Sequence, residues 1–216
     1  MRMPVCAIVA GGLVALASPS FAQGVTVGAK IGVTVATLPV LEDLFDEVFE
    51  QPGLTGNADS RTGVNAGGFI GIRVDEMFSI QPEVLFVQKG AAFDVSRGGR
   101  TIEGHMEIDY VEIPVLAAVS FVPQGTVRPF VFGGPAVGIK TRARAEAAGR
   151  EFDDFEDGIE DSEVGLVFGA GVEVSRFLVE ARDSVGLSDI GVHDGDEDDL
   201  PGLKTRVFSV LAGVGF

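Results

Sequence analysis

The residues that could perform nucleophilic catalysis are few, because the chain contains only two histidines, His105 and His193. A catalytic site of this kind needs a nucleophile and a base within hydrogen-bonding reach. Each histidine has an aspartate and a serine nearby in the sequence: Asp109 and Ser96 for the first, Asp194 and Ser188 for the second. Such groupings arise easily in segments rich in Asp and Ser. We therefore interpret both histidines as solvated loop residues and expect that the protein is not an enzyme.

Acidic pairs are the second candidate for chemistry. Carboxylates at Asp153-Asp154 and at 194–199 could bind calcium, a hard cation that takes six to eight oxygen ligands. The spacing lacks the glycine and the closing glutamate of an EF-hand loop. We expect at most weak divalent binding at these acidic segments, no designed metal site and no cofactor. The formal net charge of −16 also argues against a nucleic-acid-binding module.

A third set of residues could form ion pairs. Charged residues of both signs recur within apolar, glycine-rich segments, always on the face opposite the apolar side chains: Lys30, Arg73, Glu83, Lys89, Glu112, Arg128, Lys140, Glu173, Glu180 and Arg182, with Glu163 in the same pattern. If these segments are strands around a common interior, opposite charges at similar depths could pair there. We predict a charge network inside the protein, and this prediction requires a barrel.

The end of the chain indicates such strands. Apolar residues occupy every second position: Phe208, Val210, Ala212, Val214 and Phe216. Alternation places one apolar face on a strand, because successive side chains point to opposite sides. An apolar strand with an aromatic carboxy-terminus resembles the closing strand of bacterial outer-membrane barrels, and the resemblance implies that this strand directs assembly by the insertion machinery.

Seven further segments have the same character. The eight predicted strands are residues 24–35, 63–74, 78–93, 106–121, 127–140, 163–174, 177–187 and 204–216. Several exceed the ~9–11 residues that a tilted strand needs to cross a bilayer, and no run after residue 22 approaches the ~20 apolar residues of a membrane helix. We predict an all-β, eight-stranded antiparallel up-and-down transmembrane β-barrel.

The predicted connections alternate in length, which supports this architecture. Short turns follow the second, fourth and sixth strands, whereas the long links cover residues 36–62, 94–105, 141–162 and 188–203. Outer-membrane barrels have short periplasmic turns and long external loops. The three acidic stretches, residues 42–59, 146–163 and 189–199, would then lie outside the cell.

The two faces of the strands distinguish a membrane barrel from a soluble one. A membrane barrel turns its apolar face to lipid and fills the interior with polar side chains, and an eight-stranded interior is just wide enough for side chains to fill. We favour this arrangement over a secreted soluble barrel that binds an apolar ligand. Four prolines, Pro82, Pro114, Pro129 and Pro135, interrupt the predicted strands. Because proline removes a ladder hydrogen bond, we expect them at bulges or beyond the membrane.

The amino-terminal segment predicts export. Residues 1–22 combine an early Arg2, an apolar run and the small-residue cleavage pattern Ser20-Phe21-Ala22, which is the anatomy of a secretory signal peptide. The only cysteine, Cys6, lies inside this segment. We predict cleavage near Ala22/Gln23, with residues 23–216 forming the barrel domain.

Several motifs resemble the bacterial outer-membrane β-barrel family that includes the PorT-like proteins. They include Gln-Pro-Glu at 81–83 and Glu-Ile-Pro at 112–114, followed by glycine-rich blocks in the same order to the end of the chain. The resemblance implies an eight-stranded barrel in the Gram-negative outer membrane, and it implies little about activity. Asp183 departs from the family pattern, which usually has an aromatic residue there.

We therefore expect a non-enzymatic, integral outer-membrane barrel whose acidic extracellular loops mediate surface interactions or support envelope integrity. Its expected partners are outer-membrane lipid and the barrel-assembly machinery. A narrow transport or ligand-binding barrel is the alternative, and it requires a continuous water path through the interior.

Overall fold

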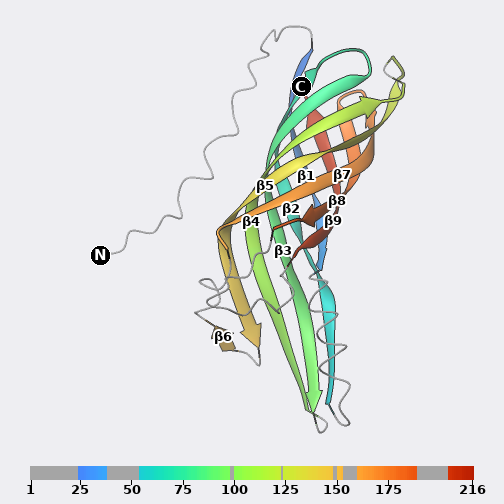
Figure 1. Ribbon diagram of the computed structural model, residues 1–216. Coiled ribbons are helices and arrows are strands. Elements are labelled where there is room, and N and C mark those ends of the chain that lie inside the picture. The colour runs from blue at the N-terminus through green and yellow to red at the C-terminus, as the bar shows by residue number, and fades with distance from the viewer. Residues whose placement is uncertain are drawn as a thin grey trace.

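The computed structural model describes residues 24–37, 54–97, 100–122, 124–147, 150–152, 160–188 and 204–216, and all bounds below refer to this part of the chain. It contains the strands β1 (Val25–Thr37), β2 (Leu54–Arg73), β3 (Phe78–Arg97), β4 (Arg100–Ser120), β5 (Val127–Ala147), β6 (Arg150–Phe152), β7 (Ser162–Val174), β8 (Phe177–Gly186) and β9 (Arg206–Gly215) (Figure 1). Within these ranges no helix is long and apolar enough to cross a membrane.

Eight of these strands form a closed antiparallel ring. Each strand pairs with its neighbour in the chain, β1 pairs with both β2 and β9, and the β4–β5 pairing completes the circle. The short strand β6 lies outside the ring and pairs only with β5. The predicted eight-stranded antiparallel up-and-down barrel is confirmed.

The apolar face of the strands is the outer face. In β1, Ile31 is 64% exposed, whereas its neighbour Lys30 is 3% exposed. The same alternation exposes apolar residues around the whole wall: Val27, Val33, Val64, Ile70, Val84, Phe86, Ile113, Val115, Val131, Val137, Val164, Phe168, Val179, Phe208 and Val210. A soluble barrel would bury these side chains. The secreted soluble barrel is therefore the wrong alternative, because this wall matches one that faces lipid.

The interior is less polar than the sequence suggests. Leu85, Leu116 and Leu211 are fully buried inside the ring. Two apolar clusters form there: Leu116, Ala118, Phe132, Ala136 and Val167 in one, and Ala36, Leu85, Val87 and Val207 in the other. The interior therefore combines the expected polar side chains with apolar ones, because eight strands enclose so little space that apolar side chains pack around the charged groups.

Four strands are much longer than the others. β2 to β5 have 20 or 21 residues each, compared with 10 to 13 in β1, β7, β8 and β9. Their extra length continues past the ring as a sheet, formed by residues 54–60, 91–97, 100–109 and 142–147, which we call the arm. Figure 1 shows the arm projecting from the end opposite the carboxy-terminus.

The arm corrects three of the predicted loops. Residues 54–62, 94–97, 100–105 and 141–147 were expected in long links but continue the strands. The ladder between β3 and β4 extends as far as the pair Arg97↔Arg100. These segments hold few large apolar side chains, and the residues that alternate with Arg142, Arg144 and Glu146 are alanines, so a pattern that relies on large apolar residues ends too early.

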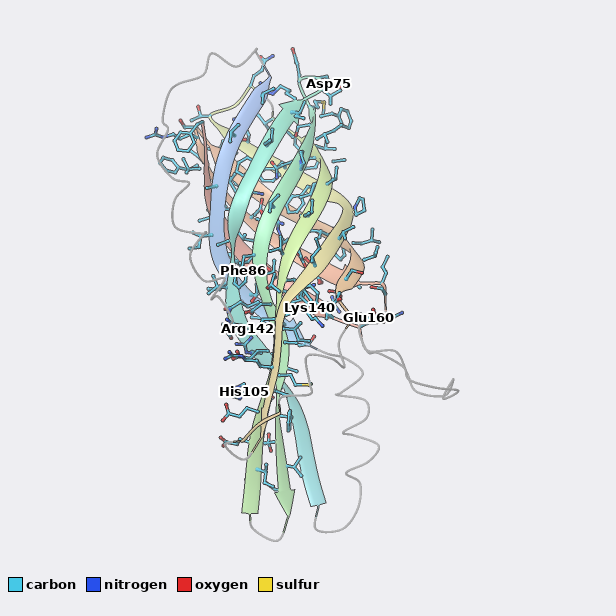
Figure 2. The ribbon with its side chains drawn as sticks, turned by 90° about the vertical axis from the view of Figure 1, so that its left-hand side faces the viewer. Asp75, Phe86, His105, Lys140, Arg142 and Glu160 are labelled. Atoms are coloured by element: carbon cyan, nitrogen blue, oxygen red, sulfur yellow. The ribbon has the colours of Figure 1, made fainter. Side chains whose placement is uncertain are left out.

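Short turns gather at the other end of the ring. The carboxylate of Asp75 accepts hydrogen bonds from the backbone N–H groups of Met77 and Phe78, at 2.7 Å each, which fixes the turn between β2 and β3 (Figure 2). Ser175, at φ 58°, supplies the turn between β7 and β8. Four half-exposed phenylalanines mark this end on the outer wall: Phe78, Phe121, Phe177 and Phe216. They form an aromatic girdle in a chain with no tryptophan and one tyrosine.

The prolines interrupt the ladders without shifting the register. The β3–β4 pairing resumes at Leu85↔Glu112 in the same register as Pro82↔Val115, and the β4–β5 pairing does the same on either side of Pro135. The register shifts instead between Ser60 and Asn65 and between Asp109 and Tyr110, where the arm joins the ring. None of the four prolines coincides with a register shift, so the expected bulges do not occur in these ladders, and the position of the prolines relative to the membrane stays a prediction. A local gap in one ladder is enough to accommodate the missing N–H.

Candidate functional site: ion clusters in the barrel interior

Four charged side chains meet across the centre of the ring. Lys30 Nζ lies 2.7 Å from Glu83 Oε1 and 2.8 Å from Glu180 Oε2. Arg182 Nη1 lies 2.8 Å from Glu83 Oε2, and Arg182 Nη2 pairs with Glu180. Each cation thus contacts both carboxylates. We call this group the central ion ring, and it connects β1, β3 and β8.

Glycines and aromatic rings make room for the central ion ring. The cross-strand partners of Lys30 are Gly67 and Gly213, so no side chain flanks it on either side. A Cβ atom at Gly28 would lie 2.3 Å from the ring of Phe69, and this ring supports Lys30 Nζ at 4.8 Å from its centroid.

The opposite cation has an equivalent support. A Cβ atom at Gly169 would lie 2.5 Å from the ring of Phe132, which stacks with the Arg182 guanidinium at 5.3 Å. In both cases the absent glycine side chain is what allows an aromatic ring to lie against the wall beneath a cation. Each cation therefore gains a cation–π contact in addition to its two carboxylates.

The charges of the central ion ring balance. Its side chains are at most 1% exposed, and it contains two cations and two carboxylates. Buried charges are tolerated only when they are paired and hydrogen-bonded. Gln81 Nε2 donates a further hydrogen bond to Glu83 Oε1, at 2.6 Å. Among the described residues, Arg182 Nε is the atom of this group that lacks a hydrogen-bond partner.

A second cluster lies nearer the arm. Lys89 Nζ lies 2.6 Å from Glu112 Oε1 and 2.7 Å from Glu163 Oε2. Thr205 Oγ1 donates to Glu163, and the Tyr110 ring lies 4.7 Å from Lys89 Nζ. This outer ion cluster joins β3, β4 and β7 to the residues that precede β9.

The remaining residues of the predicted network lie apart from these two clusters. Arg128 pairs with Glu173 at the short-turn end, and Lys140 Nζ lies 3.2 Å from Asp161 Oδ1 where the arm begins (Figure 2). Arg73 is exposed and forms no ion pair with a described residue. It lines an open cavity of about 210 Å³ at the short-turn end, together with Arg128.

Sequence reasoning did not identify several members of these clusters. Gln81 and Thr205 are uncharged, and Tyr110, Phe69 and Phe132 read as ordinary core residues. For Gln81 and Tyr110 the available signal is their position in the alternation, because each occupies the same face of its strand as a neighbouring charged residue, Glu83 and Glu112 respectively.

The proposed catalytic groupings are not assembled in the described residues. His105 Nε2 lies 3.6 Å from a Glu146 oxygen and 4.0 Å from Glu107, on the arm (Figure 2). Ser96 Oγ instead bonds Thr101 Oγ1 at 2.7 Å. His193, Asp153-Asp154 and residues 194–199 lie outside the described residues, as does the predicted signal peptide. No group of three or more metal-ligating side chains occurs in the part of the chain described above.

The outer face of β4 and β5 changes from apolar to charged where the arm begins. The outward cross-strand pairs are Ile113↔Val137 and Val111↔Ile139 within the ring, followed beyond the register shift by Glu107↔Arg144 and His105↔Glu146, whereas Asp109, the partner of Arg142, is buried. Arg61 Nη2 adds a contact of 2.6 Å to Glu107. The apolar wall therefore ends at the base of the arm.

Comparison with known proteins agrees with this geometry. A model of the family described as "Outer membrane protein beta-barrel domain" matches residues 21–191, which is well over half of the chain. No curated protein sequence matches the chain.

Three solved structures with a similar fold are distant in sequence. The outer membrane protein OprG of Pseudomonas aeruginosa is 13% identical with a TM-score of 0.47, and the match covers 89% of this chain and 96% of OprG. Neisserial surface protein A is 14% identical with a TM-score of 0.44, covering 90% and 98%. The attachment invasion locus protein Ail of Yersinia pestis is 15% identical with a TM-score of 0.44, covering 90% and 100%.

Proposed function

The chain belongs to the outer membrane protein β-barrel domain family and is an outer-membrane barrel of the Gram-negative envelope, and from this premise we propose that it is a non-enzymatic barrel with a closed interior. In this proposal the charged clusters seal and rigidify the barrel, and the arm mediates contacts at the cell surface.

The central ion ring is the observation that carries the closed interior. Four buried side chains from three strands cross the lumen, and every charge has two partners of opposite sign. The fully buried Leu85, Leu116 and Leu211 occupy space beside them. An ion entering this interior would have to displace paired charges at a large desolvation cost.

Conductance tests this proposal. We expect purified wild-type protein to add no steady ion conductance to a planar bilayer, while its heat-dependent gel shift proves that it is folded. A variant with Glu83→Ala and Glu180→Ala, if it keeps the gel shift, is expected to be leakier. Steady conductance by the wild type would contradict a closed interior.

The second candidate function is a narrow transport or ligand-binding barrel, and the cavity of about 210 Å³ at the short-turn end favours it. This candidate predicts wild-type conductance, or uptake of a small solute into vesicles. The same bilayer measurement therefore separates the two candidates.

The arm supports a role in surface contact. Because outer-membrane barrels keep their short turns in the periplasm, the arm extends into the medium. Its exposed carboxylates include Asp59, Glu103 and Glu146, and they border a hollow lined also by Phe93 and Ile102. We propose that the arm contacts cationic surfaces. Cells that carry Glu103→Gln and Glu146→Gln should adhere less to a polylysine-coated surface than wild-type cells with equal surface expression, and equal adhesion would contradict this role.

Closer kinship and biogenesis are part of the same proposal. The Gln-Pro-Glu and Glu-Ile-Pro blocks support a place among PorT-like proteins. Residues 1–22 would act as a signal peptide. The assembly signal would consist of Phe208, Val210, Ala212, Val214 and Phe216. The acidic segments would bind divalent cations weakly. Intact-mass measurement of protein from isolated outer membranes should give the mass of residues 23–216; the mass of the full chain would contradict cleavage.

A further inference from the structure

The outer wall carries an ion pair on its β8–β9 face. Arg206 Nη2 lies 2.7 Å from Asp183 Oδ2, and Arg206 Nε lies 3.2 Å from the same oxygen and 3.3 Å from Oδ1. Both residues have the phase of the apolar outer face, since Asp183 is the cross-strand partner of the half-exposed Phe208. Asp183 occupies the position where the resembling family usually has an aromatic residue, and its carboxylate pairs with Arg206 on the neighbouring strand.

The pair lies at the outer end of the apolar wall. β9 runs towards the short turns, so Arg206 at its start is on the side of the arm. Below it on the same face are Phe208 and Val210, 49% and 42% exposed, and above it is the exposed Lys204. The outer face of this wall therefore passes from apolar to aromatic to cationic within a few residues.

This position sets what the cations can contact. A cationic side chain on the lipid face is costly at the bilayer midplane and close to neutral near the interface, so Arg206 belongs at headgroup level. The Arg206 side chain is 60% exposed, whereas that of Asp183 is 17% exposed. Asp183 engages Nε and Nη2, and among the described residues no acceptor contacts Nη1. The N–H groups of Arg206 Nη1 are therefore available to donate hydrogen bonds to a group outside the protein.

We propose that Arg206 and Lys204 bind a phosphate group of an outer-leaflet lipid. Guanidinium groups donate paired hydrogen bonds to phosphate oxygens, and an ammonium group adds a point charge. A lipid is the fitting source because Phe208 and Val210, directly below, offer an apolar surface along which its acyl chains can lie. The inference concerns the outer wall and does not depend on whether the interior is closed or what the arm contacts.

The test uses the full mature protein in nanodiscs of phosphatidylcholine, with added lipid A that either carries both phosphates or has had them removed. The measured quantity is the midpoint temperature of the heat-dependent gel shift. We expect phosphorylated lipid A to raise the wild-type midpoint more than the dephosphorylated form does. The double variant Arg206→Gln and Lys204→Gln should lose most of the difference between the two lipid A forms. Its apparent affinity for phosphorylated lipid A should be about tenfold lower than that of the wild type, as expected for the loss of charged hydrogen bonds.

Controls distinguish a site from general attraction. Arg73→Gln removes an exposed cation at the opposite end and should retain the wild-type response. If the double variant does not fold in phosphatidylcholine alone, the single variant Lys204→Gln replaces it in the measurement. Lys204 is exposed and has no partner among the described residues, so this change should not affect folding. Equal responses to the two lipid A forms, an unchanged response in the variant, or the same shift from dissolved inorganic phosphate would each overturn the proposal.

Discussion

Val27 and Phe216 exchange backbone hydrogen bonds in both directions: Phe216 N donates to Val27 O at 2.8 Å, and Val27 N donates to Phe216 O at 3.3 Å. The last residue of the chain is thus the final rung of the β1–β9 pairing that closes the ring. Its aromatic side chain, 63% exposed, also belongs to the girdle at the short-turn end. The backbone pairing of Phe216 and its aromatic side chain can contribute separately to assembly of the barrel, and the two contributions can be tested separately.

Loss of the terminal aromatic ring is expected to reduce assembly. Phe216→Ser keeps the backbone pairing but removes the ring, so the fraction of protein that shows a heat-dependent shift in isolated outer membranes should fall severalfold. Phe177→Ser is the matched control, because Phe177 is an equally exposed girdle residue that is not terminal. If both variants assemble equally poorly, the girdle and not the chain terminus is responsible.

Removing one cation from the central ion ring should destabilise the barrel strongly. Lys30→Met leaves Glu83 and Glu180 with only Arg182, and breaking a buried ion pair costs about 3–5 kcal/mol. Urea-induced unfolding in phosphatidylcholine vesicles measures this change. Adding Glu180→Gln to Lys30→Met restores the charge balance and should recover part of the loss. A Lys30→Met variant as stable as wild type would show that the ring does not stabilise the fold.

The glycines beneath the aromatic rings should be sensitive to a single methyl group. Gly28→Ala and Gly169→Ala would place a methyl group against the rings of Phe69 and Phe132 and against the backbone oxygens of Val214 and Ala181. Overpacking of this kind costs about 1–3 kcal/mol. The same urea experiment measures it. Gly71→Ala is the control, because a Cβ atom there meets its nearest neighbour at an ordinary 3.7 Å. Equal effects at all three sites would indicate a general cost of replacing glycine in a strand.

The arm and the short turns should be accessible from opposite sides of the membrane. The only natural cysteine is Cys6, so a cysteine introduced after residue 22 can be labelled without background once the predicted signal peptide is removed. On intact cells, a membrane-impermeant maleimide should label Thr101→Cys, on the arm, and not Glu76→Cys, in a short turn. Disruption of the cells should make Glu76→Cys reactive. The reverse labelling pattern would invert the orientation.

Much of the ring was predictable from alternation alone. The short-turn ends of the strands agree closely with prediction, because there apolar side chains alternate up to a Gly, Asp or Ser turn. The arm ends are not predicted, since the residues that alternate with Arg142 and Arg144 are alanines, which give only a weak apolar signal. The bulges expected at the prolines do not occur, because a ladder gap at Pro135 looks the same in the sequence as a bulge.

The contacts inside the ring were harder to predict. The alternation places Lys30 and Glu180 on the inner face, but 150 positions separate them, and their depth depends on the register of every intervening strand. Phe69 and Phe132 become supports for cations only because Gly28 and Gly169 occupy the neighbouring positions across the ladder. These facing pairs follow from register, which the sequence pattern alone does not fix.

The central ion ring also has a consequence for the order of folding. Its members come from β1, β3 and β8, so the second carboxylate of Lys30 arrives only when the last part of the wall joins the first. Until then a cation within the forming wall has half of its final partners, and contacts across such long separations in sequence form slowly. Ring closure and completion of the ion pairs should therefore occur together, late in folding, and an unclosed sheet would hold two separate one-to-one pairs, Lys30 with Glu83 and Arg182 with Glu180.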